Sequence, residues 1–110
     1  MRYTTFGRTG LRVSELALGA MTFGEQGGVG APIEDCRRIL DAYLEAGGNV
    51  VDTAINYREG ASEEILGELL AGRRDRFVVA TKYTVTRDPA DPNGGGPIHY
   101  ETAARTPILR

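Results

Sequence analysis

One lysine stands out among the ionisable residues of this chain. Lys82 is the only lysine in the sequence, which also contains twelve arginines. Arginine keeps its charge in nearly any protein environment, whereas the pKa of a lysine responds to burial and to neighbouring charges. Lys82 also ends an apolar, β-branched segment, where a buried strand would stop. We therefore interpret Lys82 as a residue with a chemical role.

Two other residues could act together with Lys82. Asp52 lies at the end of a second apolar segment, and Tyr57 follows it five residues later. A tyrosine with an ordinary pKa of about 10 is a poor proton donor at neutral pH. A nearby ammonium favours the phenolate, and an aspartate can keep that ammonium charged and oriented. These three groups suit the reduction of a carbonyl, in which a hydride reaches carbon while oxygen receives a proton.

Short strands and helices alternate in the part of the chain that must position these residues. The turn residues Gly7 to Gly10 separate two short segments and predict a hairpin at the N-terminus. Three apolar segments rich in β-branched residues follow, and each is predicted to be a strand: 16–21, 49–53 and 77–82. The residues between them have helical periodicity, which predicts a parallel α/β sheet or barrel. Functional groups in such folds gather at the carboxyl ends of the strands.

Both predicted helices have an apolar stripe. The first begins near Pro32 and ends at the glycines Gly47 and Gly48, and the second begins at Ser62, whose hydroxyl is expected to cap it. Residues spaced by three or four positions should form the buried faces: Cys36, Ile39, Leu40, Tyr43 and Leu44 in the first helix, and Ile65, Leu66, Leu69 and Leu70 in the second. The glycine-rich segment 24–30 does not complete a dinucleotide-binding fingerprint, so we interpret it as a loop.

Composition narrows the class of protein without identifying it. The chain has 110 residues, of which 41% are hydrophobic and 25% charged, as expected of a globular domain or part of one. A formal net charge of -2 offers no basic surface for nucleic acid. A single cysteine makes no internal disulfide, and no apolar stretch is long enough to span a membrane. We expect a cytoplasmic protein without a metal site, and the oligomeric state stays open.

Five segments, in a fixed order, resemble the motifs of one enzyme family. They are Phe6-Gly7-Arg8-Thr9-Gly10-Leu11, Leu18-Gly19-Ala20-Met21-Thr22-Phe23-Gly24, Asp52-Thr53-Ala54 with Tyr57, Ser62-Glu63-Glu64 with Leu66-Gly67, and Ala80-Thr81-Lys82-Tyr83. Each segment is weak alone, but together they look like the aldo-keto reductases. The resemblance covers residues 2 to about 95, so residues 1–95 are expected to be a partial reductase domain, followed by a non-matching tail at 96–110.

The resemblance implies a fold, a cofactor and roles for particular residues. It implies the N-terminal part of a (β/α)8 TIM barrel, with an N-terminal hairpin and about three βα units, that binds NADPH. Tyr57 would be the general acid, Lys82 would lower its pKa, and Asp52 would pair with Lys82 near the nicotinamide. Ala20 and Met21 match positions that border the cofactor. The family's fourth catalytic residue, a histidine after the next strand, has no counterpart here, and His99 is not expected to replace it.

The resemblance leaves several functions open. The first is an NADPH-dependent oxidoreductase that reduces aldehydes or ketones, which are its small-molecule partners. A TIM barrel needs about 250 residues, so we expect the isolated chain to be inactive and interpret it as the product of a truncated or frame-shifted gene. The alternatives are a non-catalytic remnant and a regulatory or binding module that resembles the β subunits of potassium channels. The residues do not identify the substrate.

Overall fold

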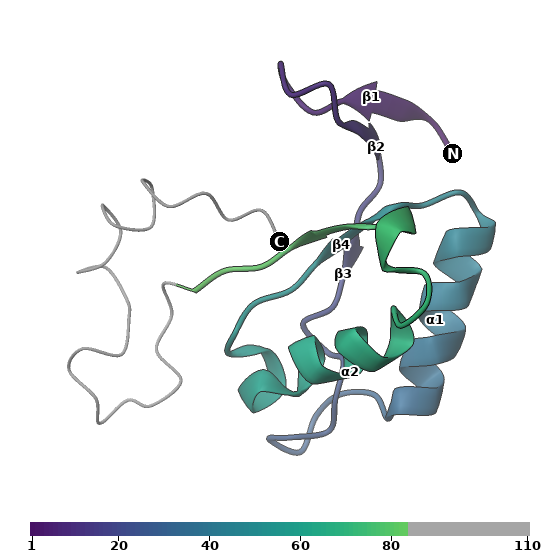
Figure 1. The fold of residues 1–110 in the computed structure, drawn as a ribbon. Coiled ribbons are helices and arrows are strands. Elements are labelled where there is room, and N and C mark those ends of the chain that lie inside the picture. The colour runs from purple at the N-terminus through teal and green to yellow at the C-terminus, as the bar shows by residue number, and fades with distance from the viewer. Residues whose placement is uncertain (84–110) are drawn as a thin grey trace.

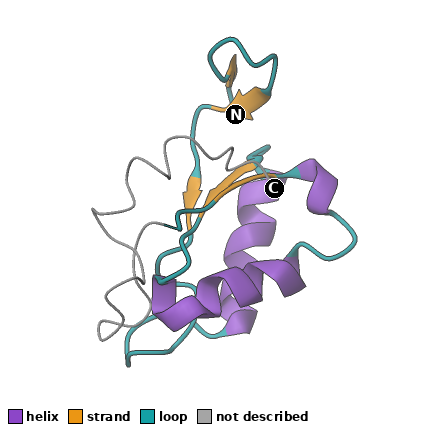
Figure 2. Ribbon diagram, turned by 60° about the vertical axis from the view of Figure 1, so that its left-hand side comes forward, coloured by secondary structure: helices purple, strands orange, loops and turns teal. Residues whose placement is uncertain are grey.

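The N-terminal hairpin is present where the turn residues predict it. The structure is a computed structural model that describes residues 1–83, shown in colour in Figure 1. Strands β1 (Tyr3–Thr5) and β2 (Arg12–Ser14) are antiparallel, and Tyr3 pairs with Ser14. The hairpin lies apart from the other strands at one end of the molecule in both ribbon views (Figures 1 and 2).

A parallel sheet of three strands forms the centre of the fold. The strands β3 (Leu18–Gly19), β4 (Val50–Asp52) and β5 (Val78–Ala80) lie side by side in chain order. Gly19 pairs with Asp52, and Asp52 pairs with Ala80, so the three strands end at the same edge of the sheet. The predicted α/β fold, with a hairpin and the first βα units of a barrel, is confirmed, although each strand is shorter than predicted.

Two helices connect these strands. Helix α1 (Ile33–Glu45) joins β3 to β4, and helix α2 (Ala61–Leu69) joins β4 to β5, together with the short 3-10 helices η1 (Tyr57–Gly60) and η2 (Arg74–Arg76). Both helices cover the same face of the sheet (Figure 2). The core between the helices and the sheet consists of buried apolar residues: Ala20, Phe23, Cys36, Leu40, Val51, Leu66, Leu69, Leu70 and Phe77.

Two helix predictions were wrong in detail. Ile39 was expected to be buried, but it is 43% exposed. Successive residues of an α-helix are about 100° apart, so Ile39 lies roughly a quarter turn away from the buried Leu40. Ser62 was expected to cap α2, yet Gly60 is the N-cap and no side chain caps this helix. Ser62 is fully buried instead, and its hydroxyl donates a hydrogen bond to the Ala20 carbonyl.

Polar side chains attach the hairpin to the sheet. The Tyr43 hydroxyl accepts a hydrogen bond from the Val50 amide at 3.0 Å and lies 2.8 Å from the Leu16 carbonyl. The Asn49 side chain accepts from the Ser14 amide at 2.8 Å and donates to the Arg12 carbonyl at 3.0 Å. These contacts join segments far apart in the sequence and fix where the chain enters β3 and β4.

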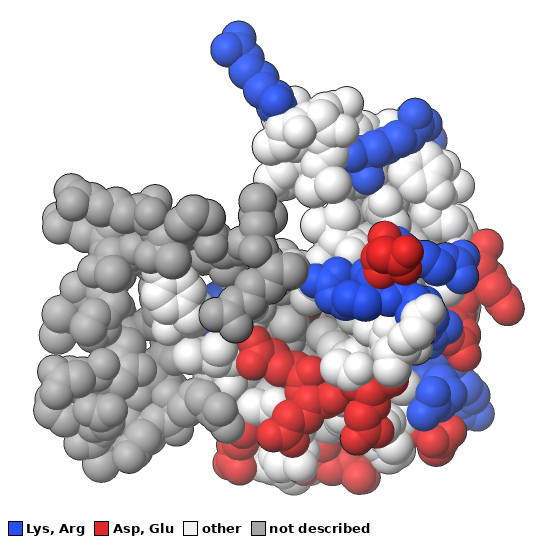
Figure 3. Space-filling view, viewed as in Figure 1, with Lys and Arg blue, Asp and Glu red and all other residues white. Residues whose placement is uncertain are grey.

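Two groups of charged side chains stand out on the face shown in Figure 3. Acidic residues gather over α2, which contains Glu63, Glu64 and Glu68, whereas arginines surround η2, which contains Arg74 and Arg76. Glu63 and Glu64 lie in the first turn of α2, where a negative charge stabilises the helix dipole. Within residues 1–83, no helix is long and apolar enough to cross a membrane. His99, the boundary near residue 95 and the tail lie outside the described residues.

Candidate active site

The Lys82 ammonium lies at the common end of β4 and β5. Its Nζ is 2.8 Å and 2.9 Å from the two carboxylate oxygens of Asp52, 2.9 Å from the Thr53 carbonyl oxygen and 3.3 Å from the Tyr57 hydroxyl. The structure therefore brings together the three residues that the sequence analysis selected. The three hydrogens of the ammonium face three acceptor groups, so Lys82 is fully occupied as a donor.

Opposing effects act on the pKa of Lys82. Partial burial of the ammonium lowers this pKa, and the hydrogen bonds to Asp52 and Tyr57, with the negative charge of Asp52, raise it. The raising effects together are larger, so the pKa of Lys82 lies above its ordinary value. Lys82 is thus a permanent positive charge at neutral pH. The same Nζ lies 5.0 Å from the centre of the Tyr57 ring, within the range of a cation–π interaction.

The Tyr57 hydroxyl lies beside the Lys82 ammonium. Its oxygen accepts from Lys82, and none of residues 1–83 accepts its hydrogen. Tyr57 is half-buried and begins η1, where Arg58 and Glu59 both adopt left-handed backbone angles, with φ of 49° and 58°. Two such residues in succession are uncommon outside glycine. This turn brings the chain from the end of β4 to α2 in a few residues and holds Tyr57 beside Lys82.

A second loop lies against this turn. Arg58 Nη1 donates to the Val29 carbonyl at 2.5 Å, which ties η1 to the glycine-rich loop after β3. The base of that loop is closed by the bridge between Phe23 and Ala31. A Cβ atom at Gly30 would lie only 1.9 Å from the Gly24 carbonyl oxygen, so this closure requires glycine. The glycine-rich segment is a closed βα loop, as the sequence analysis interpreted it.

The two residues predicted to border a cofactor differ in exposure. Met21 is 54% exposed at the end of β3, beside the edge that carries Asp52. Ala20 is fully buried, and its carbonyl accepts the hydrogen bond from Ser62, so its methyl group reaches no surface of the described residues. Among residues 1–83, no three His, Cys, Asp or Glu side chains are arranged to hold a metal ion. The contact between the cofactor and these residues stays a prediction.

Several polar residues around this site were not selected from the sequence. Thr53 and Ser62 form a buried hydrogen bond between their hydroxyls at 2.8 Å, and Thr81 Oγ1 donates to Glu63 Oε1 at 2.5 Å. Thr53 and Thr81 directly follow Asp52 and Ala80, which pair in the sheet. Their positions were the available signal in the sequence: the two threonines come directly after predicted strands, and Ser62 and Glu63 lie at the start of a predicted helix.

Comparison with known proteins agrees with this geometry. The family model described as the aldo/keto reductase family matches residues 15–105, which is more than half of the chain. The chain belongs to the aldo/keto reductase family. A solved aldo-keto reductase from Bacillus halodurans, in its holo form, is 35% identical with a TM-score of 0.70, over 84% of this chain and 29% of that chain.

Two curated fungal relatives have names that state an activity. The aryl-alcohol dehydrogenase [NADP(+)] of Phanerodontia chrysosporium is 44% identical over 82 residues, which cover 69% of this chain and 21% of that protein. Norsolorinic acid reductase B of Aspergillus parasiticus is 49% identical over 80 residues, which cover 66% and 20%. The aldo/keto reductase segment described here thus spans about a fifth of the length of these two proteins.

Proposed function

We propose that this segment supplies the proton-donating part of an NADPH-dependent carbonyl reductase site, which reduces aldehydes or ketones to alcohols. The observation that carries the proposal is the contact of one ammonium, Lys82 Nζ, with both the Tyr57 hydroxyl at 3.3 Å and the Asp52 carboxylate at 2.8 Å. The name of the Phanerodontia chrysosporium relative, an NADP(+)-dependent aryl-alcohol dehydrogenase, supports this class of reaction and cofactor.

Each of the three side chains has a separate role in the transfer of one proton. Tyr57 donates its hydroxyl hydrogen to the carbonyl oxygen, because Lys82 already occupies the tyrosine oxygen as a donor and leaves that hydrogen available. The Lys82 ammonium stabilises the phenolate that remains. Asp52 keeps Lys82 protonated through two carboxylate contacts. Proton transfer by a positioned side chain contributes roughly 10²- to 10⁴-fold to the rate.

The residues at this edge fit a nicotinamide group. Met21 offers an exposed apolar side chain, and the side chains of Asp52 and Lys82 are 42% and 43% exposed, so all three are accessible to a bound nicotinamide ring. When bound, NADPH supplies the hydride that reaches the carbonyl carbon. The Ala20 side chain is buried, so Ala20 would contact the nicotinamide only through its backbone.

A chimeric enzyme tests the proposal. Residues 1–83 would replace the aligned segment of the Phanerodontia chrysosporium dehydrogenase, and reduction of benzaldehyde by NADPH would be followed by the loss of NADPH absorbance. We expect turnover by the chimera, and a fall in kcat of about 10²-fold or more for Tyr57→Phe and for Lys82→Met. The 110-residue chain alone is expected to show little turnover, because the part that matches this dehydrogenase covers only 21% of it.

A neighbouring tyrosine provides the matched control. Tyr83 is next to Lys82 in sequence, and its buried hydroxyl has no hydrogen-bond partner among residues 1–83. Tyr83→Phe should therefore leave kcat unchanged. A Tyr57→Phe chimera within about twofold of its parent would exclude Tyr57 as the general acid. NADPH fluorescence titration of each chimera separates a loss of proton transfer from a loss of cofactor binding.

A further inference from the structure

The first turn of α2 contacts both strand ends that hold the Lys82 ammonium. Lys82 depends on the segment after β4 for the Asp52 carboxylate and the Thr53 carbonyl, and on the segment after β5 for its own backbone. Thr53 and Thr81 are the residues in these two segments whose side chains reach α2. Neither contact was needed to explain the proton transfer proposed above.

A chain of buried hydroxyls fixes the segment after β4. The Ser62 hydroxyl has a single hydrogen, which it donates to the Ala20 carbonyl at 2.7 Å. In the contact of 2.8 Å between Thr53 Oγ1 and Ser62 Oγ, the donor must therefore be Thr53. Thr53 is 2% exposed and Ser62 is 0% exposed, so no water competes with this chain. The carbonyl of the same Thr53 accepts one hydrogen of the Lys82 ammonium.

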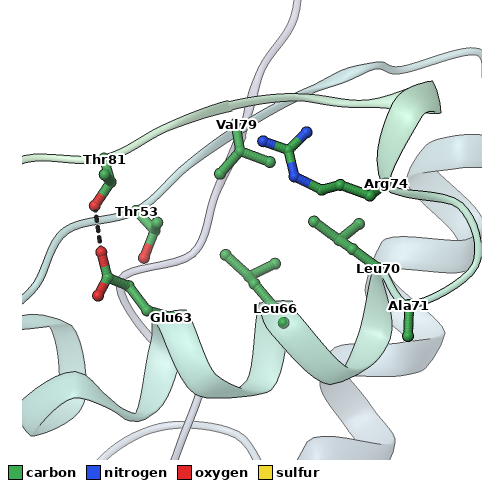
Figure 4. Close-up of a pocket in the computed structure, with 9 residues that line it drawn as sticks. Thr53, Glu63, Leu66, Leu70, Ala71, Arg74, Val79 and Thr81 are labelled. Carbon is green, nitrogen blue, oxygen red and sulfur yellow. Dashed lines mark hydrogen bonds between the residues drawn. The ribbon is translucent and has the colours of Figure 1, made fainter. Parts of the chain in front are cut away.

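A carboxylate fixes the segment after β5. Thr81, the residue before Lys82, donates its hydroxyl hydrogen to Glu63 Oε1 at 2.5 Å. Figure 4 shows this contact at one end of a hollow of about 260 Å³ between α2 and the sheet, with Thr53 beside it and Leu66, Leu70 and Val79 along its wall. Ser62 and Glu63 are adjacent in sequence, so two consecutive residues of α2 hold the two segments.

We propose that Ser62 and Glu63 are positioning residues for Lys82, acting through Thr53 and Thr81. The inference deepens the proposed function and rests on it for the role of Lys82 in catalysis. Water reaches the ion pair itself, because the Asp52 and Lys82 side chains are both more than 40% exposed. The Asp52 carboxylate therefore directs the ammonium only weakly. The buried hydroxyls and the Glu63 contact supply the rigid part of the arrangement and set the distance between Lys82 Nζ and Tyr57.

The single lysine makes this proposal measurable without turnover. In the 110-residue chain, lysine labelled with ¹³C and ¹⁵N gives signals from Lys82 alone. Its pKa would be followed by NMR as the pH rises from about 8 to about 12, with circular dichroism as a check that the chain stays folded. We expect the pKa of Lys82 to fall by roughly 0.5 to 1 in Ser62→Ala and in Glu63→Ala, because a displaced ammonium loses contact with Asp52 and Tyr57.

Conservative variants separate positioning from charge and from folding. Glu63→Gln retains an acceptor for Thr81 and should titrate close to the wild-type protein, whereas a pKa equal to that of Glu63→Ala would overturn the role of the Glu63 contact. Glu64→Ala removes an exposed negative charge from the same turn and should change the titration little. If Ser62→Ala does not fold, the double variant with Thr53→Val removes both hydroxyls and leaves no donor at Thr53 unpaired.

The outcomes distinguish this inference from the proposed function. Folded variants of Ser62 and Glu63 that titrate like the wild-type protein would show that both residues serve only stability, and would overturn the inference. A chimera whose kcat does not depend on Tyr57 would refute the proposed function and leave the titration result unchanged. In the chimera, positioning predicts that Glu63→Ala lowers kcat by a larger factor than it changes KM for NADPH.

Discussion

Replacing Lys82 by methionine should make the protein less stable at neutral pH. It should also remove the part of the pH dependence of the unfolding free energy that comes from the lysine. Methionine retains most of the apolar stem but removes the ammonium that contacts Asp52, Thr53 and Tyr57. An exposed ion pair contributes about 0.2–1 kcal/mol. The Asp52 and Lys82 side chains are 42% and 43% exposed, so solvent screening limits the gain from the added hydrogen bonds. We expect a loss of about 1 kcal/mol in the free energy of unfolding.

The raised pKa of Lys82 sets the pH range of this effect. A lysine in the unfolded chain has a pKa of about 10.4, and that of folded Lys82 is higher. The folded state therefore binds this proton more tightly, and the stabilisation is present in full below about pH 10. It is lost as the pH rises through the folded-state pKa. The difference in unfolding free energy between wild-type protein and Lys82→Met should be constant from pH 7 to about pH 10 and then decrease.

Urea denaturation followed by circular dichroism, at a series of pH values, measures this difference. Because Lys82 is the only lysine, no other lysine contributes to the comparison. Arg76→Met is the matched control, since Arg76 is exposed and its guanidinium stays charged from pH 7 to above pH 10. A difference of zero at pH 7, or one that stays constant well above pH 10.5, would refute the reasoning.

Three further predictions concern the core that supports the site. Tyr43→Phe removes the hydroxyl that accepts from Val50 and should cost about 1–3 kcal/mol in urea denaturation; an unchanged midpoint would contradict the anchoring role of Tyr43. Gly48→Ala would place a Cβ atom 2.1 Å from the Tyr43 ring and should destabilise the protein by about 1–3 kcal/mol, whereas Gly67→Ala, which meets nothing within 4 Å, should not. Burial raises the pKa of the Cys36 thiol, so iodoacetamide at about pH 8 should modify Cys36 only after urea is added; rapid modification of the folded protein would show that the site opens.

The sequence was sufficient to predict the order of elements and the three residues that meet at the strand ends. Periodicity places the strands and helices in order because burial of apolar residues repeats with the geometry of each element. Parallel strands end at a common edge, so the positions of Asp52 and Lys82 at strand ends predict that they lie near each other. Their hydrogen bonds agree with that expectation.

Contacts between distant polar groups could not be predicted in the same way. The Ser62 hydroxyl was expected to bond to its own helix, but the Ala20 carbonyl, 42 residues away, is its acceptor. The Asn49 side chain, which bridges to β2, and the left-handed pair Arg58 and Glu59 carry no periodic signal. Such features depend on which segments become neighbours in three dimensions, and this is decided by the packing of the whole sheet.

The three parallel strands lie in the sheet in the same order as in the chain, and this order allows the protein to fold while it is being synthesised. Each new parallel strand pairs with the one synthesised just before it, β4 on β3 and β5 on β4. The connecting helix is complete before the next strand appears, so each unit can dock as it leaves the ribosome. Under this order of synthesis, Asp52 and Tyr57 are in place first, and the arrival of Lys82 completes the ion pair. Until β5 has left the ribosome, the Asp52 carboxylate lacks its lysine.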